Sequence, residues 1–381
     1  MRIAFYAPMK PPSHPSPSGD RRVGRLLIAA LRAAGYEVEL ASRFRAYEGE
    51  GDERRQARLK ARGEEAAKEL IERYGALASD ARPLLWFTYH LYHKAPDWLG
   101  PTVATTLGIP YAVAEASFAG KQSRGPYALN NAAAAQAIAR ADAVISFTPE
   151  DEAGVAPLVA APERLHRLAP FLDPKPFEAA RAKREAQRAA LAAKFGLDPA
   201  LPWLLAVAMM RPGDKLASYR LLARALAAVP GRRFAFLAVG DGEARGVIES
   251  EFAFLGPGRA AFAGRQAETA LPAFYAASDL MVWPAVNEAY GMALLEAQAA
   301  GLPVIAGNER GVGEIVADGE TGALVAPRDP AALTEALCGL LDDPARRAAM
   351  AAAAQARVAA RHSLEAASRT LDAILRRLVP A

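Results

Sequence analysis

The sequence predicts two doubly wound α/β domains, one after the other along the chain. Its 381 residues exceed what one typical hydrophobic core covers, which favours two domains. In both halves short apolar runs alternate with segments of helical periodicity, which is the order of a parallel sheet covered by helices. A proline-rich span, Leu165–Pro176, separates the two series and reads as a hinge. We therefore expect a first domain over residues 1–172, a second over 173–362, and a C-terminal helix over 363–381 that packs back on the first.

The first half shows the expected alternation of strands and helices. A loop with five prolines, Pro8–Gly19, precedes a helix over Asp20–Ala34, whose apolar residues fall on one face. The densely charged segment Arg43–Arg73 predicts one or two solvated helices. An alanine-rich helix comes before the last strand of this half. The strands expected here are Arg2–Ala7, Tyr36–Ala41, Leu84–Tyr89, Ile109–Ala114 and Ala143–Phe147.

The second half repeats this pattern after the proline-rich span. A charged helix is expected over Phe177–Phe195 and an amphipathic helix over Leu216–Ala228. The last apolar residues, from Leu364 to Leu378, keep helical spacing. The strands expected here are Trp203–Met209, Phe234–Val239, Ala260–Ala263, Leu280–Trp283 and Pro303–Ala306.

Composition excludes several classes of protein. The net charge is +4 and the pI about 9.1, but no basic stripe interleaved with aromatic residues indicates a nucleic-acid partner. Cys338 is the single cysteine, so an internal disulfide is excluded. The N-terminus lacks the apolar stretch of a signal peptide, and no apolar run is long enough to span a bilayer. We expect a cytoplasmic protein, with peripheral contact at the inner face of the membrane left open.

The segment Trp283–Pro303 carries the strongest functional signal. A loop containing Glu288 ends at Gly291, and an apolar helix containing Glu296 follows. The first turn of that helix offers backbone N–H groups without intrahelical partners, and the helix dipole favours an anion there. Two carboxylates flanking an anion site suit a ligand that carries both phosphate and hydroxyl groups, such as a sugar nucleotide.

Two cations follow the first strand of the second half. Arg211 and Lys215 lie in the loop MMRPGDK, at the edge of the sheet where α/β proteins bind ligands. They can neutralise charge that builds on a phosphate leaving group. A plain surface turn is the alternative reading for this loop.

Three further positions are candidates on the first domain. Gly19 permits close backbone approach to a phosphate, and His90 and Glu115 come where two strands end. The alternative for His90 and Glu115 is a satisfied polar group at a strand end. No G-x-G-x-x-G follows the first strand, which argues against a nicotinamide dehydrogenase. No histidine pair or Asp-x-Asp motif indicates a metal, so we expect neither a metal site nor a cofactor.

These motifs resemble those of the family 4 glycosyltransferases, which have the GT-B fold. The resemblance is most specific over residues 200–330 and includes the E-x7-E pair, Glu288 and Glu296, within residues 287–326. The G-E-I-V-x-D-G-x-T-G run at 313–322, the V-G-D-G turn and the A-S-D-L strand entry are similar to the family's pattern. The chain departs from it in the first loop, where Ser18-Gly19-Asp20 replaces a glycine pair, and after the strand 109–114, where no histidine appears.

The resemblance implies two Rossmann-like domains that face each other across a cleft, and it implies roles for named residues. The family's chemistry is retaining transfer of a sugar from a nucleoside diphosphate to an acceptor hydroxyl, usually without a metal. The acceptor could be a glycan, a lipid-linked sugar or a small molecule. We expect Glu288, Arg211 and Lys215 to act in catalysis, Glu296, Gly291, Met292, Gly19, Gly264 and Arg265 to bind the donor, and His90 and Glu115 to lie on the acceptor side.

In the expected mechanism the domains close about a hinge near Asp173, which excludes water. Lys215, Arg211 and the helix end at Gly291 then stabilise the departing diphosphate. Two other functions stay open. A sugar-nucleotide epimerase of the same fold would convert the donor without an acceptor. A two-domain solute-binding protein would bind a nucleotide sugar without turnover.

Overall fold

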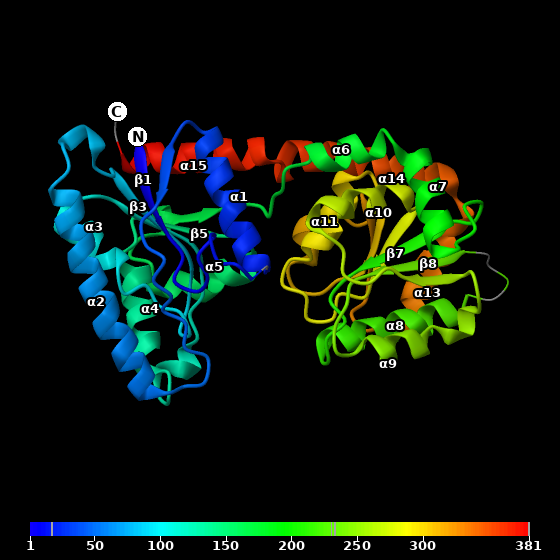
Figure 1. Ribbon diagram of the computed structural model, residues 1–381, viewed down its shortest axis with the longest axis horizontal. Helices are drawn as coiled ribbons and strands as arrows, with labels where there is room; N and C mark the ends of the chain where they lie inside the picture. Colours follow the sequence, from blue (N-terminus) through cyan, green and yellow to red (C-terminus); the bar gives the residue numbers. More distant parts are fainter. Residues whose placement is uncertain (17, 230, 232–233, 380–381) are drawn as a thin grey trace. The chain divides into compact units, whose positions relative to one another are not determined.

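The chain folds into two compact α/β units in a computed structural model (Figure 1). The first unit comprises Met1–Ala169 and Leu364–Ala381, and the second comprises Pro170–Ser363. The structure describes residues 1–16, 18–229, 231 and 234–379. Residue 17 of the proline-rich loop and residues 380–381 of the predicted C-terminal segment lie outside this description.

The first unit is built on a parallel sheet of six strands in the order β2-β1-β3-β4-β5-β6. Its strands are β1 (Arg2–Tyr6), β2 (Glu37–Leu40), β3 (Leu85–Leu91), β4 (Tyr111–Ala116), β5 (Ala143–Ser146) and β6 (Leu165–Arg167). Its α-helices are α1 (Gly19–Ala33), α2 (Glu53–Gly75), α3 (Gly100–Leu107), α4 (Ala128–Arg140), α5 (Pro149–Val155) and α15 (Leu364–Leu378). The predicted doubly wound fold is confirmed for this unit.

The second unit has its own parallel sheet of six strands, in the order β12-β11-β10-β7-β8-β9. Its strands are β7 (Trp203–Val207), β8 (Ala235–Val239), β9 (Ala260–Phe262), β10 (Leu280–Trp283), β11 (Val304–Gly307) and β12 (Gly322–Val325). Its α-helices are α6 (Lys175–Arg181), α7 (Arg184–Phe195), α8 (Asp214–Ala227), α9 (Arg245–Glu251), α10 (Leu271–Ala277), α11 (Met292–Ala299), α12 (Val312–Ile315), α13 (Pro330–Asp342) and α14 (Pro344–Arg357).

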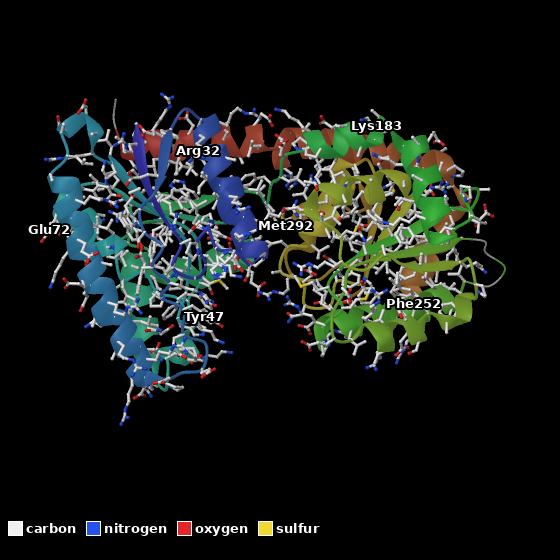
Figure 2. All side chains as sticks on the ribbon, in the orientation of Figure 1. Arg32, Tyr47, Glu72, Lys183, Phe252 and Met292 are labelled. Carbon is white, nitrogen blue, oxygen red and sulfur yellow. The ribbon has the colours of Figure 1, made fainter. Side chains whose placement is uncertain are left out.

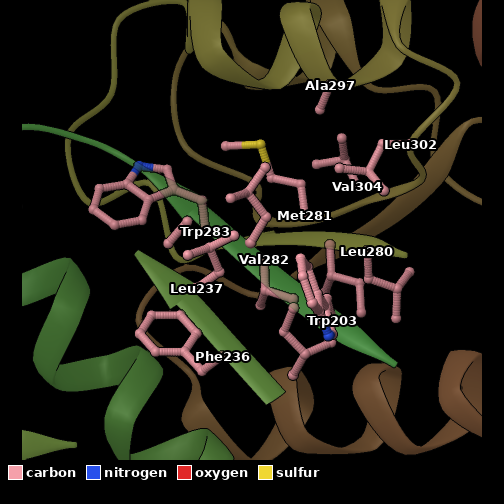
Figure 3. Packing of buried hydrophobic residues seen from close by; sticks show 14 of the residues in the cluster. Trp203, Phe236, Leu237, Leu280, Met281, Val282, Trp283, Ala297, Leu302 and Val304 are labelled. Carbon is pink, nitrogen blue, oxygen red and sulfur yellow. The ribbon is translucent and has the colours of Figure 1, made fainter. Parts of the chain in front are cut away.

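Buried apolar residues on the central strands form the core of the second unit. Trp203 of β7, Phe236 of β8 and Met281 of β10 are fully buried and pack together with neighbouring strand and helix residues (Figure 3). Parallel strands covered on both faces require such near-continuous apolar runs, which explains why the sequence located these strands well.

Two strands were missing from the sequence prediction, and both lie at a sheet edge. β6 forms the first residues of the span that we read as a hinge, and β12 follows the glutamate segment. Leu165, His166 and Arg167 of β6 are all partly exposed, as are three of the four residues of β12. An edge strand of three or four partly exposed residues has neither the length nor the apolar run that identifies a central strand.

Two helix predictions were also imprecise. Residues 43–52 precede α2 without forming a helix, and α2 itself buries Gln56, Ala67, Leu70 and Tyr74. The predicted helix over Phe177–Phe195 is two helices, α6 and α7. The many charged residues in Arg43–Arg73 therefore led to a prediction of more solvent exposure than the structure shows, because one face of a charged helix can still pack on a core.

The last helix of the chain belongs to the first unit. α15 lies beside α1 (Figure 1), and the Tyr36 hydroxyl donates a hydrogen bond of 2.7 Å to Asp372 of α15. Leu371, Ile374 and Leu375 are buried. Among the described residues, none of the helices is both long enough and apolar enough to cross a membrane.

We predict that Gly240→Ala destabilises the second unit by about 3 kcal/mol or more. Gly240 has a φ of +146°, and a Cβ there would overlap the carbonyl oxygen of Ala208. Gly246→Ala is the matched control, because a Cβ at this position of α9 meets no atom within 4 Å. Denaturant unfolding of both variants measures the difference, and equal stabilities would contradict the prediction.

Candidate functional site

Each sheet has one point at which the strand order reverses: consecutive strands are added on one side of the first strand, and later strands are added on its other side. In the second unit this point lies between β7 and β10, which are neighbours in the sheet although they are separated in the sequence. In the first unit it lies between β1 and β3. Open α/β sheets bind ligands beyond the carboxyl ends of the strands at such points. The predicted site residues concentrate at these two places.

Lys215 and Glu288 meet at the reversal point of the second unit. Lys215 lies in the first turn of α8, which follows β7, and its ammonium group forms an ion pair with the Glu288 carboxylate in the loop after β10. The same ammonium lies 5.5 Å from the centre of the Trp283 ring, and the Trp283 indole N–H is 3.4 Å from Glu288 Oε2. The structure thus brings together two residues that are 73 positions apart in the sequence.

The loop that carries Glu288 is fastened to α8 at two places. The Asn287 amide donates a hydrogen bond of 3.1 Å to Asp214, and the backbone N–H of Val286 donates one of 3.1 Å to the Ser218 hydroxyl. Asn287 has a φ of +52°, which is uncommon for a residue other than glycine and costs energy. Such a strained and anchored loop holds Glu288 in a fixed position. Sequence reasoning missed Asp214 and Ser218, because neither belongs to a recognisable motif.

The N-terminus of α11 adds backbone donors to the same edge of the sheet. Gly291 is the N-cap residue, with a φ of +76°, and no side chain caps the helix. Its carbonyl accepts from the N–H groups of Leu294 and Leu295, whereas Met292 (Figure 2) and Ala293 belong to the first turn, where N–H groups have no intrahelical acceptor. This geometry fits an anion, as the sequence suggested.

Glu296 lies one turn into α11 and is almost entirely buried, with 3% of its surface exposed. Its carboxylate accepts a hydrogen bond of 2.7 Å from the hydroxyl of Tyr275 on α10. A buried carboxylate needs hydrogen-bond donors to compensate for lost hydration, and Tyr275 supplies one. Sequence reasoning did not find Tyr275, since the contact joins two helices that are distant along the chain.

The other predicted donor-site residues lie on neighbouring loops at this edge of the sheet. Arg211 follows β7 and is exposed, and no ion pair engages it among the residues that the structure describes. Gly264 and Arg265 follow β9, and the Gly264 carbonyl accepts from the N–H of Gly240 after β8. No contact joins Arg265 to the Lys215–Glu288 pair, so the structure leaves its role as a prediction.

His90 and Glu115 lie side by side at the reversal point of the first unit. They fall between the registered pairs of β3 and β4, and both have a positive φ, 59° and 56°. Positive φ at two adjacent non-glycine positions in paired strands is a strained arrangement, and such strain often marks functional sites. His90 Nδ1 lies 3.1 Å from Asp20 Oδ1, which belongs to the first turn of α1 directly after Gly19.

The charges around His90 shift its pKa and that of its partner. Burial lowers the pKa of His90, but the carboxylates of Glu115, Asp20 and Asp151 raise it, and the net shift is upward. The contact with His90 lowers the pKa of Asp20 below its usual value. The contact therefore favours the charged forms of both side chains, and the charged imidazole of His90 can donate a hydrogen bond to a ligand.

We predict that the His90–Asp20 pair stabilises the protein most between the ordinary carboxyl pKa of 3.8 and the ordinary imidazole pKa of 6.5. Because the His90 pKa is raised, its contribution is lost as pH rises through the folded-state value. Because the Asp20 pKa is lowered, its contribution is lost as pH falls through the folded-state value. The melting-temperature difference between wild type and His90→Gln should peak in this window. A difference independent of pH would contradict the pair's ionic character.

Aromatic side chains extend from His90 along the loop after β3. The ring centroids of His90 and Tyr92 are 5.2 Å apart, those of Tyr92 and His93 are 5.3 Å apart, and those of His93 and Tyr127 are 5.0 Å apart. Burial, and to a lesser extent the nearby Tyr47 (Figure 2), raises the pKa of Tyr92 to about 12. No local sequence pattern indicates this row, because its members come from three separate segments.

Comparison with known protein families gives a match within the second unit. Residues 202–343 match the family described as glycosyl transferases group 1. This part of the chain is similar to that family. The match covers the Lys215–Glu288 pair and the N-terminus of α11, so the resemblance seen in the sequence is confirmed.

The chain matches two relatives over more than half of its own length. It is 34% identical over 217 residues to the alpha-D-kanosaminyltransferase of Streptomyces kanamyceticus, covering 57% of this chain and 55% of that protein. It is also 34% identical over 229 residues to the D-inositol 3-phosphate glycosyltransferase of Rhodococcus jostii strain RHA1, covering 58% of this chain and 49% of that protein. The chain thus spans about half the length of these relatives.

Solved structures match the chain over nearly its whole length. A glycosyltransferase from Rickettsia africae has a TM-score of 0.77 at 15% identity and covers 100% of this chain and 98% of that one. Anabaena Alr3699/HepE in complex with UDP has a TM-score of 0.71 at 18% identity and covers 99% of this chain and 100% of that one. This likeness shows the GT-B fold, as predicted.

Proposed function

We propose that this protein transfers a sugar from a nucleoside diphosphate sugar to an acceptor hydroxyl, with retention of anomeric configuration and without a metal ion. The meeting of Lys215, Glu288 and the N-terminus of α11 at one reversal point carries the proposal. A cation and free backbone donors suit a diphosphate, and a carboxylate beside them suits sugar hydroxyls. Both relatives named above are themselves glycosyltransferases.

The proposed mechanism depends on charge that grows on the leaving diphosphate. Lys215, Arg211 and the N–H groups at Gly291 and Met292 stabilise that charge more in the transition state than in the ground state, which lowers the barrier. Glu288 holds the sugar through its hydroxyls, and Glu296 holds the ribose. The leaving phosphate can itself take the proton of the acceptor hydroxyl, so this scheme needs no strong protein base.

The acceptor is proposed to bind the first unit near His90 and Glu115. His90 and the neighbouring row of rings, Tyr92, His93 and Tyr127, present hydrogen-bond donors and aromatic faces. Such surfaces suit a polyhydroxylated ring better than a plain alcohol, because ring faces pack on C–H groups while polar edges bind hydroxyls.

A thermal-shift screen tests the donor half of the proposal. The protein is melted with UDP, GDP, ADP and dTDP and their sugar derivatives, each with and without magnesium. A ligand present at 100 times its dissociation constant adds about 2.7 kcal/mol of stability, which raises the melting temperature measurably. UDP comes first, because Alr3699/HepE was solved in complex with UDP. Stabilisation by one nucleotide, equal with and without magnesium, is expected; no response to any of them would contradict the donor site.

Product analysis tests the reaction itself. With the stabilising donor and a set of sugar, cyclitol and lipid-linked acceptors, a new glycoside should form, and its anomeric proton coupling should match that of the donor. Conversion of the donor without any acceptor would instead identify an epimerase. Binding without any turnover would contradict an enzymatic role.

A further inference from the structure

A wide-open cavity lined by three arginines lies in the first unit, on elements that the proposed reaction does not use. Its volume is about 410 Å³, which is within the range of small-molecule sites. One wall is the edge strand β6 with His166 and Arg167, and the other is the helix α15. The edge position of β6 leaves this side of the sheet without a further strand among the described residues.

The charge of this cavity is strongly positive. Arg167, Arg369 and Arg377 line it, and its lining includes no carboxylate. Arg167 forms an ion pair of 3.2 Å with Glu152. Within the described part of the chain, no ion pair engages Arg369 or Arg377, although other surface arginines such as Arg376 are paired. Two guanidinium groups without a carboxylate partner repel each other on one wall, and a bound anion would offset this unfavourable electrostatic energy.

The spacing of the α15 residues explains how the sequence builds this wall. Arg369, Ala373 and Arg377 are four positions apart in succession, so they share one face of the helix. Ile374 is buried and anchors the helix, while the small side chain of Ala373 leaves room between the two arginines. Thr370 adds a hydroxyl to the same wall.

His166 supports the same interpretation. Burial and the positive charge of Arg377 lower its pKa, so the imidazole is neutral near pH 7 and can donate one hydrogen bond without adding charge. Arginine forks match the oxygen geometry of phosphate groups, and Thr370 can donate as well.

We propose that this cavity binds a phosphate-bearing ligand through Arg369, Arg377 and Arg167. The ligand is either a soluble phosphate ester or the phosphate of an anionic lipid headgroup, since both present the same oxygen atoms. None of the residues that line this cavity is assigned to the proposed donor or acceptor site, and all of them belong to the first unit. The inference therefore does not depend on the proposed transfer reaction.

Melting in inorganic phosphate tests the soluble form of the proposal, with potassium chloride of equal ionic strength as reference. Phosphate also stabilises proteins by exclusion from their surfaces, so the difference between variants is the readout. The variant Arg369→Gln/Arg377→Gln should lose the specific shift. The control variant Arg54→Gln/Arg346→Gln removes the same amount of charge at exposed positions elsewhere and should keep the specific phosphate shift. Ala373→Glu places a carboxylate between the arginines and should also lose it.

Two further variants and a second probe complete the test. Lys215→Ala should keep the phosphate shift; if this variant loses it while Arg369→Gln/Arg377→Gln keeps it, phosphate binds the donor site and the inference is wrong. Co-sedimentation with phosphatidylcholine vesicles, with and without phosphatidylglycerol, tests the lipid form. We expect Arg369→Gln/Arg377→Gln to lose one of the two responses, with an affinity lower by about a hundredfold or more because two charge-assisted contacts are removed. This loss would support the cavity, and the probe that is affected would identify the source of the phosphate. If Arg369→Gln/Arg377→Gln and its control Arg54→Gln/Arg346→Gln respond equally to phosphate and to the vesicles, the proposed phosphate site is wrong.

Discussion

Replacing Lys215 with alanine is expected to lower kcat about a hundredfold to a thousandfold, which is the usual effect of removing one donor that stabilises a developing oxyanion. Lys215 lies at the reversal point of the second sheet, paired with Glu288 and above the Trp283 ring. This position gives it access to a diphosphate held by the N-terminus of α11. Steady-state kinetics with the donor identified by the thermal screen measure the change.

The control for Lys215 is Lys194→Ala, which removes an exposed lysine from α7 in the same unit. It should leave kcat unchanged. A higher KM with unchanged kcat in Lys215→Ala would mean that Lys215 binds the ground state and the transition state equally, which contradicts the leaving-group role. Lys215 also positions Glu288. The activation free energy should therefore rise less in the double variant Lys215→Ala/Glu288→Gln than the sum of its rises in the two single variants.

Glu296→Gln is expected to weaken binding of the nucleoside diphosphate about tenfold to a hundredfold, since a hydrogen bond to a charged acceptor contributes about 1.5–3 kcal/mol. Glu296 is buried in α11, and glutamine keeps its size while removing its charge. Calorimetric titration of wild type and variant measures the loss.

Tyr275→Phe is the matched control for Glu296. It removes the hydroxyl that donates to the Glu296 carboxylate and leaves the carboxylate in place. If Glu296 contacts the ribose, Tyr275→Phe should bind the nucleotide nearly as well as wild type. Equal losses in both variants would assign Glu296 a structural role between α10 and α11. No loss in either would place the nucleotide elsewhere.

The central strands and the glutamate segment could be predicted because their signals are local. A strand such as β8, Ala235–Val239, is buried on both faces and must be continuously apolar. The loop and helix around Gly291 follow from a glycine that adopts a φ of +76° ahead of an apolar helix. The edge strands β6 and β12 gave no such signal, because only part of each strand is buried.

The partners of the site residues could not be predicted, because they depend on distances between segments. The Lys215–Glu288 ion pair joins residues 73 positions apart, and the Tyr275–Glu296 hydrogen bond joins two different helices. The arginine cavity needs β6 and α15, which are separated in the sequence by the whole of the second unit. His90 was predicted at the end of a strand, but its positive φ and its contact with Asp20 depend on β4 and α1.

The sequence by itself determined the two parallel α/β units, the glutamate motif and the family resemblance of the second unit, because apolar periodicity and motif spacing are local properties of the sequence. Only the tertiary structure decided which side chains meet: Lys215 with Glu288, His90 with Asp20, and Arg369 and Arg377 with Arg167. The reason is physical. Periodicity reports whether a residue faces a core, whereas the strand order of the sheet decides which loops lie next to each other.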